Sequence, residues 1–179
     1  MASNPVVLIL GSGPRVGAAV AKKFASLKYS VAIVSRKANN AKTEEGYLSL
    51  QADFGDPSSI PAIFKKVEAE FKTAPSVVIY NAATLSPPPV EGDIFSTTAD
   101  TLVGDFNLNT VSPFIAAQQA VNGWKTLSQD SKKAFIYTGN ILNITNIPAP
   151  IMLTLGIGKS ASSSWISLAD SLYSKSGHR

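Results

Sequence analysis

The sequence predicts an α/β fold in which a parallel sheet of about five strands carries helices on both faces. First, five apolar residues at 6–10 lead directly into a glycine-rich turn and a helix. Second, strand and helix patterns alternate along the rest of the chain, which is typical of parallel sheets. Third, 179 residues with 45% hydrophobic content suit one globular domain with a sizeable core.

The first half of the chain supplies four of the expected strands. Residues 6–10 form the first, and the helix after it has apolar positions at Val16, Val20, Phe24 and Leu27. Residues 29–35 and 46–51 are expected to be the second and third strands. A helix then opens near Pro57, with its apolar side at Ile60, Ile63, Phe64, Val67 and Phe71. Residues 76–80 are the fourth strand.

The second half begins with three consecutive prolines within residues 84–93, which predict a surface loop. Residues 97–124 are expected to be mainly helical, with a kink or break at Pro113. Residues 134–138 are the fifth strand, and 139–153 an irregular loop. The last helix is expected at 156–174. Its apolar side is formed by Ile166, Leu168, Ala169, Leu172 and Tyr173.

The turn at 11–17 reads Gly-Ser-Gly-Pro-Arg-Val-Gly and lies between a buried strand and a helix. Glycines permit a tight turn and let backbone N–H groups approach a phosphate, while the helix N-terminus adds partial positive charge. We therefore expect a dinucleotide to contact Gly11, Gly13, Arg15, Val16 and Gly17. The alternative is a strand–turn–helix whose glycines serve packing alone.

The second strand ends in Ser35-Arg36-Lys37. An acidic residue near this place typically binds the ribose 2′-OH of NAD, whereas a guanidinium can bind a 2′-phosphate with two hydrogen bonds. Arg15 in the glycine turn supplies a second cation. The pattern predicts a preference for NADP(H), against the alternative of a solvated basic strand end.

Two further strand ends carry candidate cofactor contacts. Asp53 and Phe54 follow the third strand, where Asp53 could accept a hydrogen bond from the adenine amino group or cap the next helix. Asn81, Ala82 and Ala83 follow the fourth strand. The two alanines permit close approach of a ring, and Asn81 can bind backbone and hold the strand ends together.

Composition excludes several classes of site. The chain has no cysteine and a single histidine near its end, so we expect no disulfide, metal site or Ser-His-Asp triad. The net charge of +4 suits an anionic ligand, but the basic residues form no stripe with interleaved aromatics, so no nucleic-acid partner is expected. No apolar run approaches about 18 residues and no signal peptide is apparent, which predicts a soluble cytoplasmic protein without a membrane partner.

Taken in order, the glycine turn, Asp53, the Asn-Ala-Ala at 81–83, Asn109 and Lys159 resemble the short-chain dehydrogenase/reductase family over nearly the whole chain. The resemblance implies a Rossmann-type domain spanning 1–179 with strand order 3-2-1-4-5. It also implies a nicotinamide cofactor, a small carbonyl or alcohol substrate, and a homodimer through helices at about 98–124 and 156–174. The family has two more strands after the last helix, so the chain is expected to be truncated where the sixth would start.

The sequence departs from the family's motifs at several positions. Arg15 replaces the middle glycine of the cofactor turn, and Gly13 is additional. The family's active site combines Asn, Ser, Tyr and Lys. Asn109 and Lys159 match the first and last, and we assign the Ser position to Asn140. The Tyr position, four residues before Lys159, is Leu155.

Leucine has no proton to exchange, and general acid catalysis is typically worth about 10²–10⁴ in rate. Lys159, Tyr137, Thr138 or a bound water could replace the phenol, and Lys159 is favoured because burial lowers the pKa of a lysine. Lys159 could instead only hold the nicotinamide ribose, as the resemblance implies. The sequence thus supports an atypical NADP(H)-binding oxidoreductase, with a catalytically degenerate nucleotide-binding or sensor protein as the alternative. Lyase or isomerase chemistry on the same scaffold is a third hypothesis.

Overall fold

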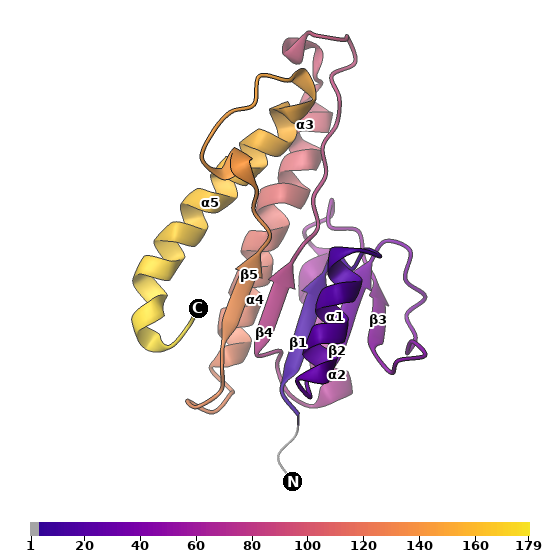
Figure 1. Ribbon diagram of the computed structural model, residues 1–179, viewed down its shortest axis with the longest axis vertical. Helices are drawn as coiled ribbons and strands as arrows, with labels where there is room; N and C mark the ends of the chain where they lie inside the picture. The colour runs from indigo at the N-terminus through magenta and orange to yellow at the C-terminus, as the bar shows by residue number, and fades with distance from the viewer. Residues whose placement is uncertain (1–3) are drawn as a thin grey trace.

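The computed structural model describes residues 4–179 and contains one five-stranded sheet in the order β3-β2-β1-β4-β5 (Figure 1). All four strand pairs are parallel, so the predicted fold class and strand order are confirmed. The strands are β1 (Val6–Leu10), β2 (Ser30–Ser35), β3 (Leu48–Gln51), β4 (Val77–Tyr80) and β5 (Ala134–Tyr137). Their ends differ from the expected ones by no more than two residues.

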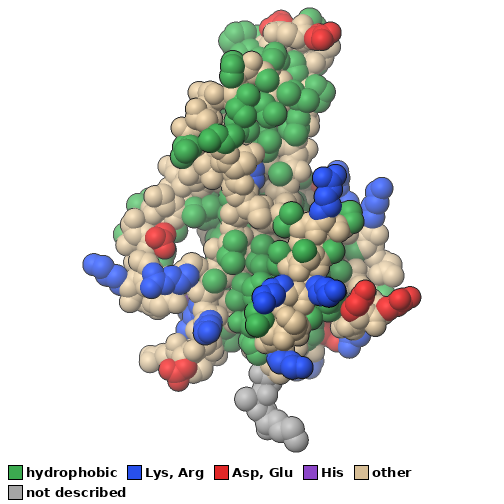
Figure 2. All heavy atoms as spheres, viewed as in Figure 1, with side chains coloured by type: hydrophobic (Ala, Val, Ile, Leu, Met, Phe, Trp, Pro, Cys, Tyr) green, Lys and Arg blue, Asp and Glu red, His purple; other side chains and the backbone are tan. Residues whose placement is uncertain are grey.

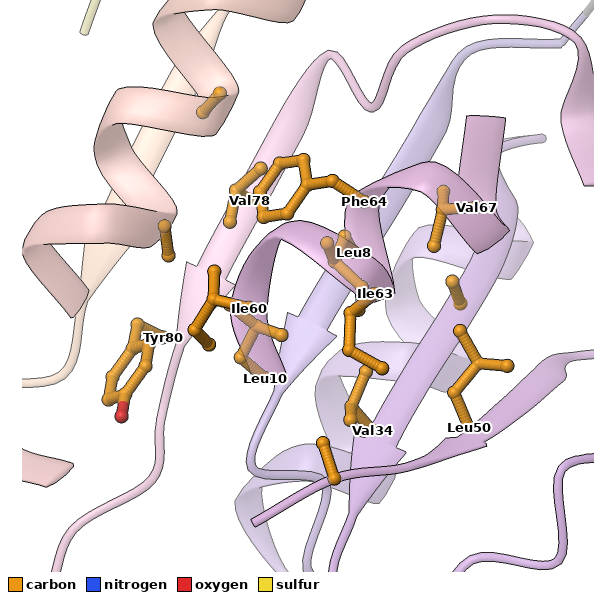
Figure 3. Packing of buried hydrophobic residues seen from close by; sticks show 14 of the residues in the cluster. Leu8, Leu10, Val34, Leu50, Ile60, Ile63, Phe64, Val67, Val78 and Tyr80 are labelled. Carbon is orange, nitrogen blue, oxygen red and sulfur yellow. The ribbon is translucent and has the colours of Figure 1, made fainter. Parts of the chain in front are cut away.

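The main helices are α1 (Val16–Ser26), α2 (Ser59–Phe71), α3 (Ala99–Phe106), α4 (Ser112–Trp124) and α5 (Leu153–Tyr173). Alternate residues of β1 serve opposite faces of the sheet, because side chains of a strand alternate in direction. Val7 and Ile9 pack with α1, whereas Leu8 and Leu10 pack with α2 and α4. Figure 3 shows the core on the side of Leu8 and Leu10, where one side of α2 lies against the sheet.

The helix expected at 97–124 is interrupted, but not by a break at Pro113 itself. A π-helical turn, η2 (Asn107–Val111), joins α3 to α4, and Pro113 lies in the first turn of α4. Proline has no N–H and therefore cannot donate to the carbonyl of residue 109, four positions earlier, as a regular helix requires. The irregularity thus falls on the turn that precedes the proline.

The remaining segments differ little from expectation. The helix α5 begins at Leu153, three residues earlier than predicted. His178 forms a parallel bridge with Lys133, and the N–H of Phe135 donates to the carbonyl of Arg179 over 2.7 Å, so the last residues run along the outer edge of β5. Within residues 4–179, no helix combines the length and apolar character needed to cross a membrane.

Candidate functional site

A pocket of about 540 Å³ lies at the carboxyl ends of the central strands, where ligands bind in open α/β sheets. Most of the predicted cofactor residues line it. The lining consists of Gly11, Ser12, Gly13, Pro14, Ser35, Arg36, Lys37, Phe54, Asn81, Ala82, Ala83, Thr84 and Leu108. Five predicted cofactor residues do not contribute to its walls: Arg15, Val16, Gly17, Asp53 and Lys159.

The floor of this pocket is a close contact between the glycine turn and the end of β4. Gly11 has a φ of +95°, and a Cβ there would lie 2.3 Å from the backbone nitrogen of Ala82. The Nδ2 of Asn81 donates to the carbonyl of Gly11 over 2.9 Å. Only glycine fits this position, because a side chain would meet both an unfavourable φ and the backbone of β4.

The N-terminus of α1 is open toward a ligand. Arg15 precedes the helix, and its guanidinium has no acceptor with which to cap it. The N–H groups of Ala18 and Ala19 donate to the carbonyls of Gly13 and Arg15 over 3.0 and 3.1 Å, so within the described residues those of Val16 and Gly17 are the ones left without an acceptor. A Cβ on Gly17 would lie 2.5 Å from the Cα of Ser12, whereas a Cβ on Gly13 would have no neighbour within 4 Å. Gly17 thus serves packing, and the additional Gly13 leaves open space on the pocket wall.

The end of β2 presents two exposed cations to the pocket, Arg36 and Lys37. No aspartate or glutamate lines the pocket. In the part of the chain that the structure describes, neither cation forms an ion pair; the pair found there joins Lys42 to Glu70. The electrostatic character of this wall is therefore positive, with guanidinium and ammonium groups free to meet an anion.

Asp53 has a local role in the structure. Its Oδ1 accepts a hydrogen bond from the N–H of Gly55 over 2.9 Å, and its carbonyl accepts one from the Ser59 hydroxyl over 3.0 Å. Ser58 occupies the N-cap position of α2 and makes no capping hydrogen bond with its side chain. The carboxylate thus closes the turn ahead of α2, and a contact with adenine stays a prediction.

Asn109 lies in the π turn and is fully buried. Its side-chain amide makes two hydrogen bonds with the backbone of Thr84, donating over 2.8 Å and accepting over 3.1 Å. Its carbonyl has no helical donor at Pro113 and instead accepts from the hydroxyls of Tyr137 and Ser162, at 3.0 and 2.8 Å. Asn109 therefore joins the pocket wall, β5 and α5 at one point.

Lys159 projects from α5 into the same region and is 3% exposed. Its Nζ donates to the carbonyl of Thr138 over 2.6 Å and lies 4.2 Å from the centroid of the Tyr137 ring. Burial lowers the pKa of Lys159 from its ordinary value of 10.5 to about 8. This amine can therefore exchange a proton near neutral pH.

The other proton donors considered from the sequence are already engaged. The Tyr137 phenol donates to Asn109, and burial raises its pKa. The Thr138 hydroxyl donates to the carbonyl of Tyr80 over 3.3 Å. Leu155, which the sequence resemblance aligns with a tyrosine, is buried. Lys159 is the group among these whose proton is most easily exchanged.

Asn140, assigned to the family's serine, is exposed at the start of the short helix η3 (Ile141–Asn143). Its Oδ1 accepts from the N–H of Leu142 over 3.0 Å, so the side chain caps η3. The structure brings Asn109, Lys159, Tyr137 and Thr138 together, and it gives Asn140 this separate task. A catalytic role for Asn140 stays a prediction.

Comparison with known proteins assigns the family. The family model described as short chain dehydrogenase matches residues 5–150. This chain belongs to the short-chain dehydrogenase family. Short chain dehydrogenase/reductase dmxR12 of Cryptosporiopsis sp. is 36% identical, with an alignment that covers 99% of this chain and 74% of that protein.

Solved structures of short-chain dehydrogenases show the same fold. A 4-hydroxyisoleucine dehydrogenase complexed with NADH superposes with a TM-score of 0.82 at 20% identity, covering 98% of this chain and 72% of that one. A short chain dehydrogenase from Burkholderia cenocepacia in complex with NADP gives 0.79 at 21% identity, with 97% and 70% covered. At these identities the likeness concerns the fold.

A second set of residues, not predicted from the sequence, holds the candidate site of this short-chain dehydrogenase together. Thr154, Gly158 and Ser162 recur at every fourth position of α5 and are all buried against α3 and the π turn. Such a spacing places small residues on one side of a helix. The spacing was visible in the sequence, but its partners were not: the Asp105 carboxylate accepts from Thr154, the Asn109 carbonyl accepts from Ser162, and the Thr110 hydroxyl donates to the carbonyl of Gly158.

Proposed function

We propose that this chain is an NADP(H)-dependent oxidoreductase acting on a small carbonyl or alcohol, with Lys159 handling the proton that a tyrosine handles in other family members. The observation that carries the proposal is the pocket at the sheet edge. Free cations occupy one wall of it, and another wall, at Thr84, is hydrogen-bonded to the buried Asn109 beside Lys159. Nucleotide binding and proton exchange are thus adjacent.

The residues present fit a dinucleotide phosphate. The close approach at Gly11 and the uncapped start of α1 leave room and N–H donors for a pyrophosphate. Arg36 and Lys37, without acidic neighbours in the pocket, suit the 2′-phosphate of NADP(H) better than the free 2′-OH of NAD. The related structures bind NADH in one case and NADP in another, so the preference rests on these two side chains.

A bound nicotinamide supplies or accepts the hydride. Lys159, charged below about pH 8, would donate a proton to the carbonyl oxygen during reduction, and its neutral amine would accept one during alcohol oxidation. The Thr138 carbonyl and the Tyr137 ring orient the amine. Asn109 fixes the loop that begins at Thr84 and thereby the wall between the two halves of the site.

Calorimetric titration with NADPH and NADH tests the nucleotide site. We expect NADPH to bind at least about tenfold more tightly, since charge-assisted hydrogen bonds contribute roughly 1.5–3 kcal/mol each. Arg36→Ala should reduce the affinity for NADPH about tenfold and leave that for NADH nearly unchanged. Lys22→Ala, an exposed cation on α1, is the matched control. Equal affinity of the parent for both nucleotides would contradict the NADP(H) assignment.

Turnover tests the chemical half of the proposal. With NADPH and a panel of aldehydes and ketones, we expect slow reduction that falls as pH rises through about 8 and is lost in Lys159→Met. Leu155→Tyr, which restores a phenol, should raise the rate by about 10²-fold or more. Tight NADPH binding with no turnover in either the parent or Leu155→Tyr would favour the nucleotide-binding or sensor function instead.

A further inference from the structure

A second pocket, of about 410 Å³, lies between the start of α5, the loop that precedes it, and the short helix η1 (Ile94–Ser96). Its walls are almost wholly aliphatic, with Ile94, Leu142, Ile147, Pro148, Met152 and Ile157 as the larger side chains. Asn146 is the single polar side chain among its lining residues, and none is charged. The volume lies in the range typical of small-molecule sites.

This aliphatic pocket adjoins the site around Lys159. Gly156 lines it, and Lys159 follows three positions later on α5, so the two are neighbours on the helix surface. On the opposite wall, the carbonyl of Leu142 accepts from the hydroxyl of Ser160, the residue after Lys159, over 3.0 Å. A molecule that reached Lys159 with its carbonyl group could thus place its remaining atoms in this pocket.

The charges around the pocket are distributed unevenly. Residues 84–98 and 139–158, which surround it, contain no lysine or arginine, although the whole chain has 16. The acidic residues Glu91 and Asp93 are exposed in the first of these segments. Figure 2 shows hydrophobic side chains and acidic atoms at this end of the molecule, and blue basic groups gathered toward the other end. A carboxylate or phosphate would find no cationic partner here and would lose hydration.

We propose that the aliphatic pocket receives the body of the substrate, so that the substrate is an uncharged, predominantly apolar ketone or alcohol and not a keto acid, a phosphorylated compound or a coenzyme A thioester. Naming the occupant as the substrate rests on the proposed oxidoreductase function. The exposed side chains of Phe95 and Ile144, 91% and 84% accessible, extend the apolar surface beyond the pocket. They provide further area for an apolar ligand and none for an anion.

A matched pair of probes tests the proposal by binding alone. 2-Decanone and 9-oxodecanoic acid share a methyl ketone and chain length and differ by a terminal carboxylate. We expect ligand-observed NMR titration of the 179-residue chain, with and without saturating NADPH, to give at least tenfold tighter binding of the neutral ketone. Comparable or tighter binding of the keto acid would overturn the proposal.

Substitutions locate the binding. Ile147→Lys places a cation in the wall of the pocket, on a loop where it need not disturb a helix or strand. This substitution should weaken binding of the neutral ketone at least fivefold and strengthen binding of the keto acid. Leu27→Lys, an exposed leucine after α1, should change neither. Unchanged ketone binding in Ile147→Lys would show that the ligand lies elsewhere and would overturn the assignment.

The outcomes for this proposal and for the oxidoreductase function are separable. If the ketone binds at Ile147 and is never reduced with NADPH, the oxidoreductase function fails while the preference for an uncharged ligand holds. If NADPH-dependent reduction occurs equally well with the ketone and the keto acid, the oxidoreductase function holds and the substrate class proposed here is wrong.

Discussion

At the scale of single residues, Lys159 combines features that seldom occur together. It is a buried cation, and no carboxylate pairs with it among the residues that the structure describes. Its stabilising contacts are a carbonyl and an aromatic ring. Such a group lowers the stability of the fold, because burial disfavours the charged form. A buried, unpaired lysine is therefore expected where function requires it.

Stability measured against pH should reveal this cost. Below about pH 8 the amine is charged in both states, and the folded chain bears the whole penalty. Between about pH 8 and pH 10.5 the unfolded chain holds more protons than the folded one, so the free energy of unfolding rises with pH. Lys159→Met should therefore be more stable than the parent near pH 7, by on the order of 2 kcal/mol, with the difference shrinking toward pH 10.5. Urea denaturation across this range, with Lys22→Met as control, provides the test. A difference independent of pH would show that the penalty is absent.

At the scale of elements, the packing of α5 on the π turn depends on one glycine. A Cβ on Gly158 would lie 2.4 Å from the Cβ of Asn109, whereas a Cβ on Gly156 of the same helix would meet nothing within 4 Å. Gly158→Ala should destabilise the fold by about 1–3 kcal/mol, because the helix must move away from Asn109. Gly156→Ala should stabilise it by about 0.5–1 kcal/mol, since alanine favours helix. Denaturant titration of both variants checks the opposite signs, and equal effects would contradict this packing.

A buried hydrogen-bond cluster joins the same elements nearer their ends. Asp105 of α3 accepts from the hydroxyls of Thr154 and Ser86, over 2.6 and 3.1 Å. It thus connects α3, α5 and the loop after β4. Asp105→Ala should cost about 2–3 kcal/mol, because the buried Thr154 hydroxyl and the half-buried Ser86 hydroxyl lose their acceptor. The exposed Asp100 of the same helix offers the control Asp100→Ala, expected to cost at most about 1 kcal/mol. Thermal unfolding would contradict the cluster's role if both variants melted alike.

These elements also show where sequence reasoning succeeds. The helices were predictable because their apolar residues repeat near the period of 3.6 that burial on one side imposes. The central strands β1 and β4 were predictable because burial on both faces makes them continuous apolar runs. The π turn was not predictable, although Pro113 indicated an irregularity in this helix. Its form depends on two hydroxyls from separate strands. The Tyr80 hydroxyl donates to the carbonyl of Leu108, and the Tyr137 hydroxyl donates to the carbonyl of Asn109. Contacts of this kind between distant segments leave no local pattern.

The candidate site divides in the same way. The gathering of the candidate cofactor residues around one pocket was predictable, since the carboxyl ends of parallel strands meet at one edge. The orientation of their side chains was not: Asp53 binds its own turn and Asn140 caps η3. Short polar side chains commonly bond to nearby backbone, and this local competition decides their direction.

At the scale of the whole molecule, the basic and the apolar surfaces are separated. The cations are concentrated in residues 15–72 and 125–133, which contain the basic wall of the proposed nucleotide pocket, while the segments around the aliphatic pocket have none. A molecule arranged in this way can hold an anionic cofactor and a neutral substrate side by side. The surface potential then favours each ligand at its own end.

A further apolar surface lies along α4 and α5, where a groove of about 570 Å³ includes Phe114, Leu168 and Leu172. The two leucines are 61% and 64% exposed, which is costly for a helix face in water and typical of an interface. We expect the chain to form a homodimer through these helices, with twice the 18.8 kDa mass of the chain in light scattering. The double variant Leu168→Glu/Leu172→Glu should be monomeric, because burying four carboxylates in a symmetric interface is unfavourable. Leu27→Glu, at a similarly exposed leucine just after α1, should stay dimeric. A parent chain that remains monomeric at high concentration would refute the dimer.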